Sequence, residues 1–354
     1  MDQLNKLETE SPVIVSSEPE KTDAKITMPD FLTVAPSPHI KSPEKTSTVM
    51  LDVVIALLPA FAWGVYVFGF RALLLAVISI AACIGFEAGT EFLLHRPITV
   101  GDLSAVVTGL LLVMNLPVTV PLWMPVVGAF FAIVIVKQLF GGIGKNFVNP
   151  ALAARVFLFS WAAEMTNFSA VGSRVNSLAY TLGSADIVAG ATPLASMKTG
   201  ALPNATLFDL FIGNIGGCIG EVSALLLIAG GLWLLIRKVI TWHIPVAYIG
   251  TVAILTFAFP RLDGTSVESM LYEILAGGLM LGAIYMATDY ATSPVTRYGR
   301  LLFGVGCGLI TFLIRRFGSY PEGVSFSILI MNLLVFYIDK LTMPRRFGGK
   351  NHAK

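Results

Sequence analysis

Thr192 is the residue of this sequence whose neighbouring residues most suggest a chemical role. It lies within Asp186–Thr199 (DIVAGATPLASMKT), in the long polar connection between Trp161 and Leu207 of an otherwise apolar chain. A threonine hydroxyl is a poor nucleophile without an activating base, and no histidine lies near it in the sequence. Self-catalysed chemistry is therefore not expected, whereas a separate enzyme could modify an exposed hydroxyl here. The tripeptide Gly-Ala-Thr before proline is a weak motif, so an ordinary loop residue remains the alternative.

Ionisable residues in apolar segments are the second group of candidates, because burying a charge in a membrane is costly and commonly marks a function. The members of this group are Glu87, Glu91, Lys137, Arg155, Glu221 and Asp289. They could form an ion or proton path, or supply counter-charges for an anionic cofactor. Alternatively, they lie at the membrane interface or pair with one another for packing. We favour packing for Glu87, Glu91 and Lys137, and a function for Asp289.

The segment Lys137–Leu152 (KQLFGGIGKNFVNPAL) is a third candidate. Three glycines and two asparagines, Asn146 and Asn149, precede a proline at the first position of an expected helix, where proline fits best. Asn149 is therefore the predicted N-cap. The N–H groups at this helix end could hold an electronegative ligand edge. From the residues alone, a tight turn between two membrane spans is the favoured interpretation.

The elements that must position these residues are membrane helices. The chain has 354 residues, of which 55% are hydrophobic and 13% charged, far fewer charges than the roughly 25% of soluble proteins. Ten runs are candidates to cross the membrane, although the third and fifth are short and bordered by Gly, Asn and Pro, which indicates broken or re-entrant helices. They are 49–68, 72–94, 103–116, 122–140, 150–164, 207–236, 244–259, 270–289, 301–317 and 324–341.

A weak internal repeat divides these runs into two halves. Gly109–Pro121 (GLLLVMNLPVTVP) resembles Gly282–Pro294 (GAIYMATDYATSP), and Phe140-Gly141 matches Phe317-Gly318. Because five is odd, two halves of five spans have opposite orientations, and inverted repeats place functional sites where broken helices meet. The predicted fold is therefore an all-α integral membrane protein with about ten transmembrane helices in two inverted five-helix repeats.

Lys and Arg predict the orientation and the division of the chain. If the N-terminus is cytoplasmic, the cytoplasmic side from Lys41 onward carries thirteen of these cations and the opposite side six. Both termini are then cytoplasmic, and the Thr192 loop is extracytoplasmic. The predicted parts are a polar cytoplasmic N-terminal tail (1–47), a first half (48–165), an extracytoplasmic loop (166–206), a second half (207–341) and a basic C-terminal tail (342–354).

Composition excludes several classes of function. The three cysteines are isolated, with no CxxC pair, which argues against a self-contained iron–sulfur or zinc site. The four histidines lie in the tails or singly at the edges of the spans, so paired haem ligands are not expected. No basic patch interleaved with aromatics suggests nucleic-acid binding, and residues 1–47 lack the apolar stretch of a signal peptide.

The order and spacing of several motifs resemble a known family. The motifs are KQLFGGIGKNFVNPAL, AGATPLASMKT, GNIGGCIGEVSALL, MATDYATSP and YPEGVSFSILIMN, and the match covers Ser37 to Arg346. They are similar to the D subunit of the Rnf electron-transport complex and to the B subunit of the sodium-pumping NADH:quinone reductase. The GATPLA variant, the length and the short polar N-terminal tail look closer to the Rnf protein.

This resemblance implies cofactors at particular residues. It implies that Thr192 carries FMN through a phosphoester bond, attached by a separate flavin transferase that uses FAD. Ala189 stands where serine is common in the family motif, a tolerable change because the threonine is the acceptor. In the quinone reductase protein a non-covalent riboflavin lies near the asparagine-rich turn, which Asn146 and Asn149 match. Arg155 and Asp289 are candidates to bias the charge of a flavin or of a coupled cation.

The resemblance also implies a role within a larger assembly. The chain would be one membrane subunit of a ferredoxin:NAD⁺ oxidoreductase in a bacterial or archaeal cytoplasmic membrane. It would relay electrons coupled to Na⁺ or H⁺ transport, without a complete active site of its own. Its expected partners are membrane A/E-type, flavin-carrying G-type, iron–sulfur B-type and NADH-binding C-type subunits. The alternatives are a solute channel or secondary transporter with no redox role, which inverted repeats also suit, and a purely structural scaffold subunit.

Overall fold

The computed structural model describes residues 45–169, 190–203, 205–262 and 265–344, and within these ranges it contains helices and no β-strand. The predicted tails therefore lie outside the described residues, apart from a few residues of each. The helices of the first half are α1 (Thr46–Phe68), α2 (Phe70–Leu93), η1 (Val100–Asp102), α3 (Ser104–Met114), α4 (Trp123–Phe130), η2 (Phe131–Gln138), α5 (Pro150–Leu158), η3 (Phe159–Trp161) and α6 (Ala162–Met165).

The later part of the chain is also helical. Its helices are α7 (Pro193–Lys198), α8 (Leu207–Ile212), α9 (Ala224–Ile236), α10 (His243–Ala258), α11 (Ser266–Leu275), α12 (Leu279–Leu281), η5 (Gly282–Met286), α13 (Arg297–Phe317) and α14 (Val324–Thr342). Every predicted run contains at least one of these helices. The all-α prediction is therefore confirmed for the described residues.

Four of the described helices are long and apolar enough to cross a membrane, or five if a bent pair counts as one span. The four are α1, α2, α13 and α14, and the pair is α11 with α12 and η5, bent by 65°. Shorter apolar helices account for four of the other runs, and the fifth run, 150–164, contains only the short helices α5, η3 and α6. These helices describe a multi-pass membrane protein.

The sixth predicted run, 207–236, is wrong as a continuous helix. Helix α8 ends at Gly213, whose φ of 106° is a left-handed conformation that favours glycine. The chain then continues without helix to Ser223, which caps α9 with its side chain. Hydropathy missed this break because the intervening segment, GNIGGCIGEV, is apolar although it is rich in glycine.

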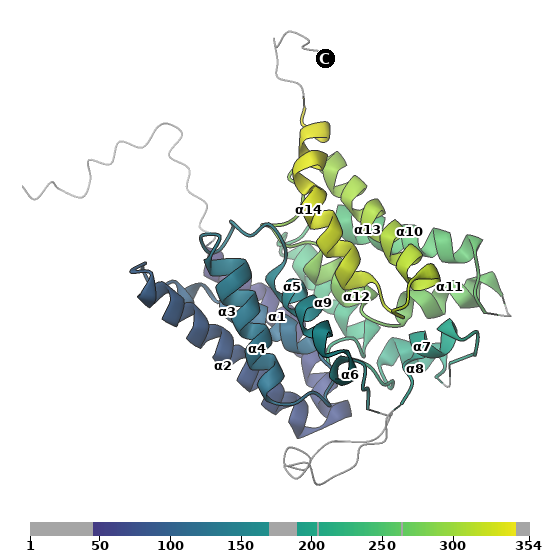
Figure 1. Cartoon of the computed structure of the whole chain (residues 1–354). Helices are drawn as coiled ribbons and strands as arrows, with labels where there is room; N and C mark the ends of the chain where they lie inside the picture. Colours follow the sequence, from purple (N-terminus) through teal and green to yellow (C-terminus); the bar gives the residue numbers. More distant parts are fainter. Residues whose placement is uncertain (1–44, 170–189, 204, 263–264, 345–354) are drawn as a thin grey trace, which may run out of the picture. The chain divides into compact units, whose positions relative to one another are not determined.

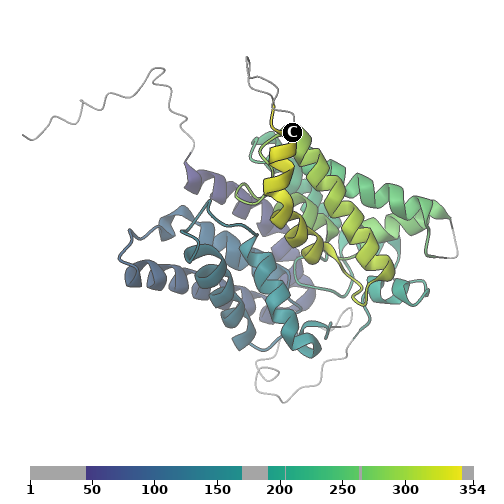
Figure 2. The ribbon, with the colours of Figure 1, turned by 45° about the horizontal axis from the view of Figure 1, so that its top comes forward.

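Helices from distant parts of the sequence pack side by side. In Figures 1 and 2, α2, α3 and α4 gather on one side, and α10, α13 and α14 on the other. Between these groups α1 contacts α9, and α5 contacts α14. A buried apolar core runs through both groups. Short helices and irregular turns lie between the two groups, and they carry most of the candidate residues.

Candidate functional site

Four of the five predicted site residues line two hollows. The first, here called the asparagine hollow, has a volume of about 810 Å³ that includes open solvent, and it is lined by Asn146, Asn149 and Asp289, among others. The second, called the Thr192 hollow, has a volume of about 440 Å³ that includes open solvent, and it is lined by Thr192, with Glu221 and Glu322. Arg155 contacts the carboxyl groups of the second hollow. Asp289 and Arg155, the candidates to bias the charge of a flavin or of a coupled cation, therefore lie at different places.

Asn149 caps helix α5, as its position before Pro150 predicts. Its Oδ1 accepts hydrogen bonds from the N–H groups of Ala151 at 3.0 Å and Leu152 at 3.3 Å. Its Nδ2 donates to the carbonyl oxygen of Met286 at 3.2 Å. These N–H groups are thus already bonded, so Asn149 fixes the wall of the asparagine hollow rather than leaving a free helix end for a ligand.

The side chain of Asn146 differs from that of Asn149 in its hydrogen bonding. Its side chain is half-buried at the asparagine hollow, and its buried Oδ1 has no hydrogen-bond partner in the described part of the chain. An unpaired buried acceptor is costly, so a ligand that donates a hydrogen bond would satisfy it. The positive φ angles of Gly141, Gly142 and Gly144 give the turn before Asn146 its tight path.

Asp289 lies in the turn after η5, at the other side of the asparagine hollow. Its Oδ2 accepts from the Thr292 hydroxyl at 3.1 Å, and its Oδ1 accepts from the Ala291 N–H at 3.4 Å. Both are local contacts within the turn. No described cation lies within ion-pair distance of Asp289, so its charge is available to the hollow.

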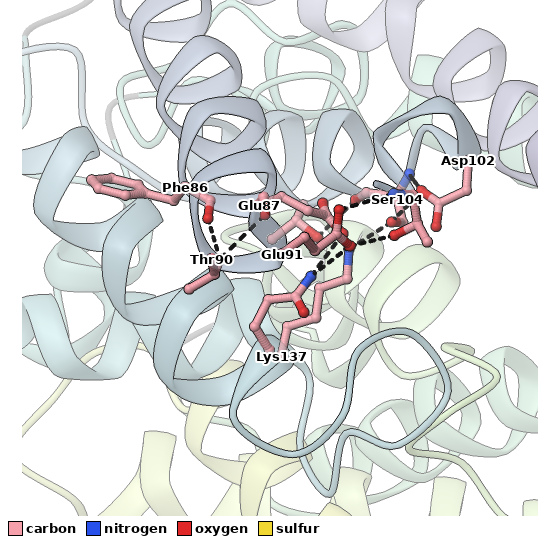
Figure 3. Close-up of polar contacts among 10 residues, drawn as sticks. Phe86, Glu87, Thr90, Glu91, Asp102, Ser104 and Lys137 are labelled. Atoms are coloured by element: carbon pink, nitrogen blue, oxygen red, sulfur yellow. Dashed lines mark hydrogen bonds and ion pairs between the residues drawn. The ribbon is translucent and has the colours of Figure 1, made fainter. Parts of the chain in front are cut away.

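Lys137 is paired, as the packing interpretation predicts. Figure 3 shows it between Glu87 of α2 and Ser104 of α3. Its Nζ lies 2.6 Å from Glu87 Oε1 and 2.6 Å from Ser104 Oγ. Glu91 accepts hydrogen bonds from the N–H of Thr99 at 2.8 Å and from Gln138 at 3.2 Å, and Gln138 also donates to Glu87 at 3.2 Å.

Thr192 is the N-cap of the short helix α7. Its Oγ1 accepts a hydrogen bond from the N–H of Ala195 at 3.3 Å, and the residue is half-buried. The following Pro193 lines both the Thr192 hollow and an adjoining open hollow of about 890 Å³. Thr192 therefore lies at one hollow, and its neighbours Ala191 and Pro193 line the adjoining one. The preceding residues of the loop, 170–189, lie outside the described residues.

Arg155 is buried in α5 and joins several elements. Its Nη2 lies 2.7 Å from Glu322 Oε2, and its Nη1 lies 3.3 Å from Glu221 Oε1. Nη1 also donates to Asn115 Oδ1 and to Ser325 Oγ, each at 2.9 Å. These partners come from the turn after α3, the glycine-rich segment before α9, and the start of α14.

The two carboxyl groups beside Arg155 lie in loops outside the helices, and they differ in acidity. Burial, with the neighbouring charge of Glu322, raises the pKa of Glu221 to about 8. Burial would also raise the pKa of Glu322, but Arg155 and then Arg315 outweigh it and hold this pKa below its ordinary value. The pair thus combines one carboxylate with one carboxyl group that is readily protonated.

Sequence reasoning missed Glu322, and it identified Asn115 only as part of the repeated segment Gly109–Pro121. Glu322 lies in a polar turn, YPEG, where a solvated carboxylate is ordinary, so only the fold reveals that it faces Arg155. Asn115 had a signal, because it precedes the proline-bounded turn of the internal repeat. Its Nδ2 contacts Met286 Sδ at 3.5 Å in the repeated segment of the second half.

Comparison with known proteins identifies the family that the chain matches. A family model described as NQR2, RnfD, RnfE matches residues 33–348. The chain is 49% identical over 323 residues to the D subunit of the Na⁺-translocating ferredoxin:NAD⁺ oxidoreductase complex of Acetobacterium woodii, covering 90% of this chain and 95% of that protein.

Two further relatives cover similar lengths. The D subunit of the proton-translocating ferredoxin:NAD⁺ oxidoreductase complex of Clostridium ljungdahlii is 41% identical, over 91% of this chain and 97% of the relative. The D subunit of the ion-translocating oxidoreductase complex of Stutzerimonas stutzeri is 39% identical, over 86% and 93%.

Proposed function

The chain belongs to the NQR2, RnfD, RnfE family, and we propose that it is the D subunit of an ion-translocating ferredoxin:NAD⁺ oxidoreductase complex. In this proposal it carries FMN covalently on Thr192, relays electrons through the membrane part of the complex, and couples this relay to ion transport. The expected partners are the A/E-, G-, B- and C-type subunits, with a flavin transferase for maturation.

The setting of Thr192 is the observation that carries the flavin proposal. A residue that accepts a bulky group needs a reachable hydroxyl and space beside it, and Thr192 has both because it lines the Thr192 hollow and precedes Pro193 of the adjoining hollow. A flavin bound there supplies one- and two-electron chemistry, while the protein sets its orientation and electrostatics. Arg155, the carboxylate of Glu322 and the carboxyl group of Glu221 supply this electrostatic environment.

The asparagine hollow is the proposed site of a second, non-covalent flavin, riboflavin. The orphaned Oδ1 of Asn146 fits a ligand with an N–H donor, such as an isoalloxazine ring. Asn149 fixes the wall beside it, and Asp289 contributes a carboxylate without a described cation partner. The proposal assigns Asn146 and Asn149 to orienting this ligand, and Asp289 to biasing the charge of the ligand or of a coupled cation.

A line of polar contacts connects the walls of the two hollows. Arg155, which contacts Glu221 and Glu322 of the Thr192 hollow, donates to Asn115. The amide of Asn115 contacts the side chain of Met286. The carbonyl oxygen of Met286 in turn accepts from Asn149 of the asparagine hollow. We propose that these contacts keep the two hollows at a fixed distance and orientation, which electron transfer between two redox groups requires.

Ten spans in two inverted halves remain our proposal for the topology. The contacts repeat between the halves: α2 packs on α3 and α4, and α10 packs on η5 and α13. The pairs α1 with α9 and α5 with α14 would then be related by the pseudo-two-fold axis. Excess Lys and Arg support cytoplasmic termini and an extracytoplasmic Thr192.

Flavin fluorescence on a denaturing gel tests the proposed function. A covalently bound flavin stays with the unfolded chain, so the wild-type band should fluoresce under ultraviolet light and Thr192→Ala should not. Thr199→Ala, which changes an exposed threonine at the other end of α7, is the matched control and should keep the signal. A dark wild-type band would favour the transporter alternative.

A further inference from the structure

The inner wall of the Thr192 hollow places two carboxyl groups around one guanidinium. Arg155 lies 2.7 Å from Glu322 and 3.3 Å from Glu221. Glu322 is better satisfied of the two, because its other oxygen accepts a hydrogen bond from the N–H of Gly278. A single guanidinium neutralises only one carboxylate, so two ionised carboxylates here would leave a buried negative charge.

Glu221 is the less satisfied member of this pair. It is only 7% exposed, and its Oε1 lies 3.3 Å from Arg155 Nη1 without making a hydrogen bond within the described ranges. The side chain lines the same hollow as Thr192. A Cβ added at Gly278 would lie 2.5 Å from this oxygen, so the absence of a side chain at Gly278 keeps the space beside it open. A buried oxygen that accepts no hydrogen bond is less costly on a neutral acid than on a carboxylate.

We propose that Glu221 is held as a neutral carboxylic acid and donates a hydrogen bond into the Thr192 hollow. Its partner there would be an acceptor edge of a bound ring system, either a carbonyl oxygen or a ring nitrogen with a lone pair. The proton occupies the carboxyl group, and Glu322 remains the carboxylate that balances Arg155. The hydrogen bond rests on the proposed flavin at Thr192, whereas the protonation of Glu221 does not.

The charged and titratable groups around Glu221 agree with this assignment. Glu322, from the turn before α14, disfavours ionisation of Glu221, while Arg155 of α5 and Arg315 of α13 favour it. Arg315 is engaged elsewhere, since it pairs with Glu273 at 3.5 Å and donates to the backbone oxygens of Glu273 and Ala276. Cys218, from the same segment as Glu221, also contacts it. Burial outweighs the two cations, and the pKa of about 8 leaves the proton in place at neutral pH.

Matched amide substitutions separate the two carboxyl groups. Glutamine has the shape of a neutral glutamic acid and can also donate a hydrogen bond, so Glu221→Gln should melt within about 2 °C of the wild type. Glu322→Gln removes the carboxylate that balances Arg155 and should lower the melting midpoint by roughly 5 to 10 °C. The midpoint is measured on the assembled complex in detergent, as the fraction of this chain that stays soluble after heating. An equal or larger loss for Glu221→Gln would overturn the proposal.

Carbodiimide labelling tests the proton itself. These reagents add to protonated carboxyl groups in apolar surroundings, so peptide mapping should find the adduct on Glu221 and not on Glu322. Its yield should fall between about pH 6 and about pH 9 as the acid ionises. An adduct on Glu322 instead, or an unlabelled Glu221 at every pH, would contradict the proposal.

A flavin-free protein separates this inference from the proposed function. Thr192→Ala should give the same pH-dependent adduct on Glu221, because the proton depends on Arg155 and Glu322 and not on the cofactor. If flavin is bound, Glu221→Leu should shift its absorption bands while Glu221→Gln leaves them in place. A shift of the same size in both variants would overturn the proposed hydrogen bond. An unmodified Thr192 with Glu221 labelled would overturn the flavin proposal and the hydrogen bond that rests on it, but not the protonation of Glu221.

Discussion

The side chain of Arg155 contacts residues from several elements. Its loss leaves two buried carboxyl groups without their cation. Removing one partner of a buried ion pair commonly costs about 3–5 kcal/mol. Arg155→Leu should therefore destabilise the chain by this amount, measured as the heat-induced loss of the soluble chain from the assembled complex.

Arg237→Leu is the control for Arg155. Arg237 pairs with Asp52 at 3.2 Å, but its side chain is 47% exposed. Exposed pairs contribute less than about 1 kcal/mol, so this variant should behave almost as the wild type. Equal losses in the two variants would show that the buried cluster does not contribute to stability as described.

Glu221 predicts a pH dependence with a definite sign. Its pKa is about 8 in the folded chain against an ordinary value of 4.5, so between these values the folded state binds more protons than the unfolded state. Its contribution to stability is therefore greatest below pH 4.5 and is lost as the pH rises to about 8. Melting midpoints of the wild type should fall relative to Glu221→Gln across this window and level off above it. Parallel curves would refute the assignment.

The proposed role of Asp289 predicts that its substitution lowers ion transport without changing the cofactor content. Asp289→Asn removes a charge at the asparagine hollow while its hydrogen bonds within the turn can be kept. Ion uptake into vesicles, driven by electron transfer, should fall while the flavin content stays unchanged. Glu268→Gln, which changes an exposed carboxylate in the first turn of α11, is the control and should transport normally. Unchanged coupling between electron transfer and ion uptake in Asp289→Asn would contradict the hypothesis.

At the level of elements, hydropathy located the helices better than their breaks. Long apolar helices such as α1, α2 and α14 follow from composition, because a run of about 20 apolar residues is a strong signal. The break before α9 did not, since its glycine-rich segment is apolar and only backbone conformation reveals it. The N-cap at Asn149 was predictable because it depends on neighbouring residues alone.

The partners within the site were not predictable for a related reason. Arg155 and Glu322 are 167 residues apart, and nothing local in either segment identifies the other. The sequence singled out Arg155, Glu221 and Thr192, but only the fold places Glu221 and Thr192 at one hollow beside Arg155.

The crossing of α1 and α9 predicts a strong effect at a single glycine. A Cβ at Gly230 would lie 2.2 Å from the carbonyl oxygen of Ala56 in α1, so Gly230→Ala forces the helices apart. Overpacking of this kind costs about 1–3 kcal/mol. In the described ranges nothing lies within 4 Å of a Cβ at Gly250 in α10, so Gly250→Ala should be neutral or gain up to about 1 kcal/mol of helix propensity. Melting midpoints of both variants in the complex check this, and equal effects would contradict the close packing.

At the scale of the whole described molecule, residues from both halves of the chain form the contacts that connect the two hollows. Asn115 and Arg155 come from the first half, and Glu221, Met286 and Glu322 come from the second. Since relatives are named for Na⁺ and for proton translocation, membership of the family leaves the coupling ion open. These contacts predict a fixed separation between the two proposed flavin sites rather than a choice of ion.

The most direct test of the account is the mass of the peptide that carries Thr192, taken from the assembled complex. Trypsin cleaves after Arg174 and Lys198, which releases Val175–Lys198. The account predicts that this peptide carries the added mass of one FMN less one water, with fragmentation placing it on Thr192. An unmodified peptide from a complex that is active in ferredoxin:NAD⁺ electron transfer would contradict it.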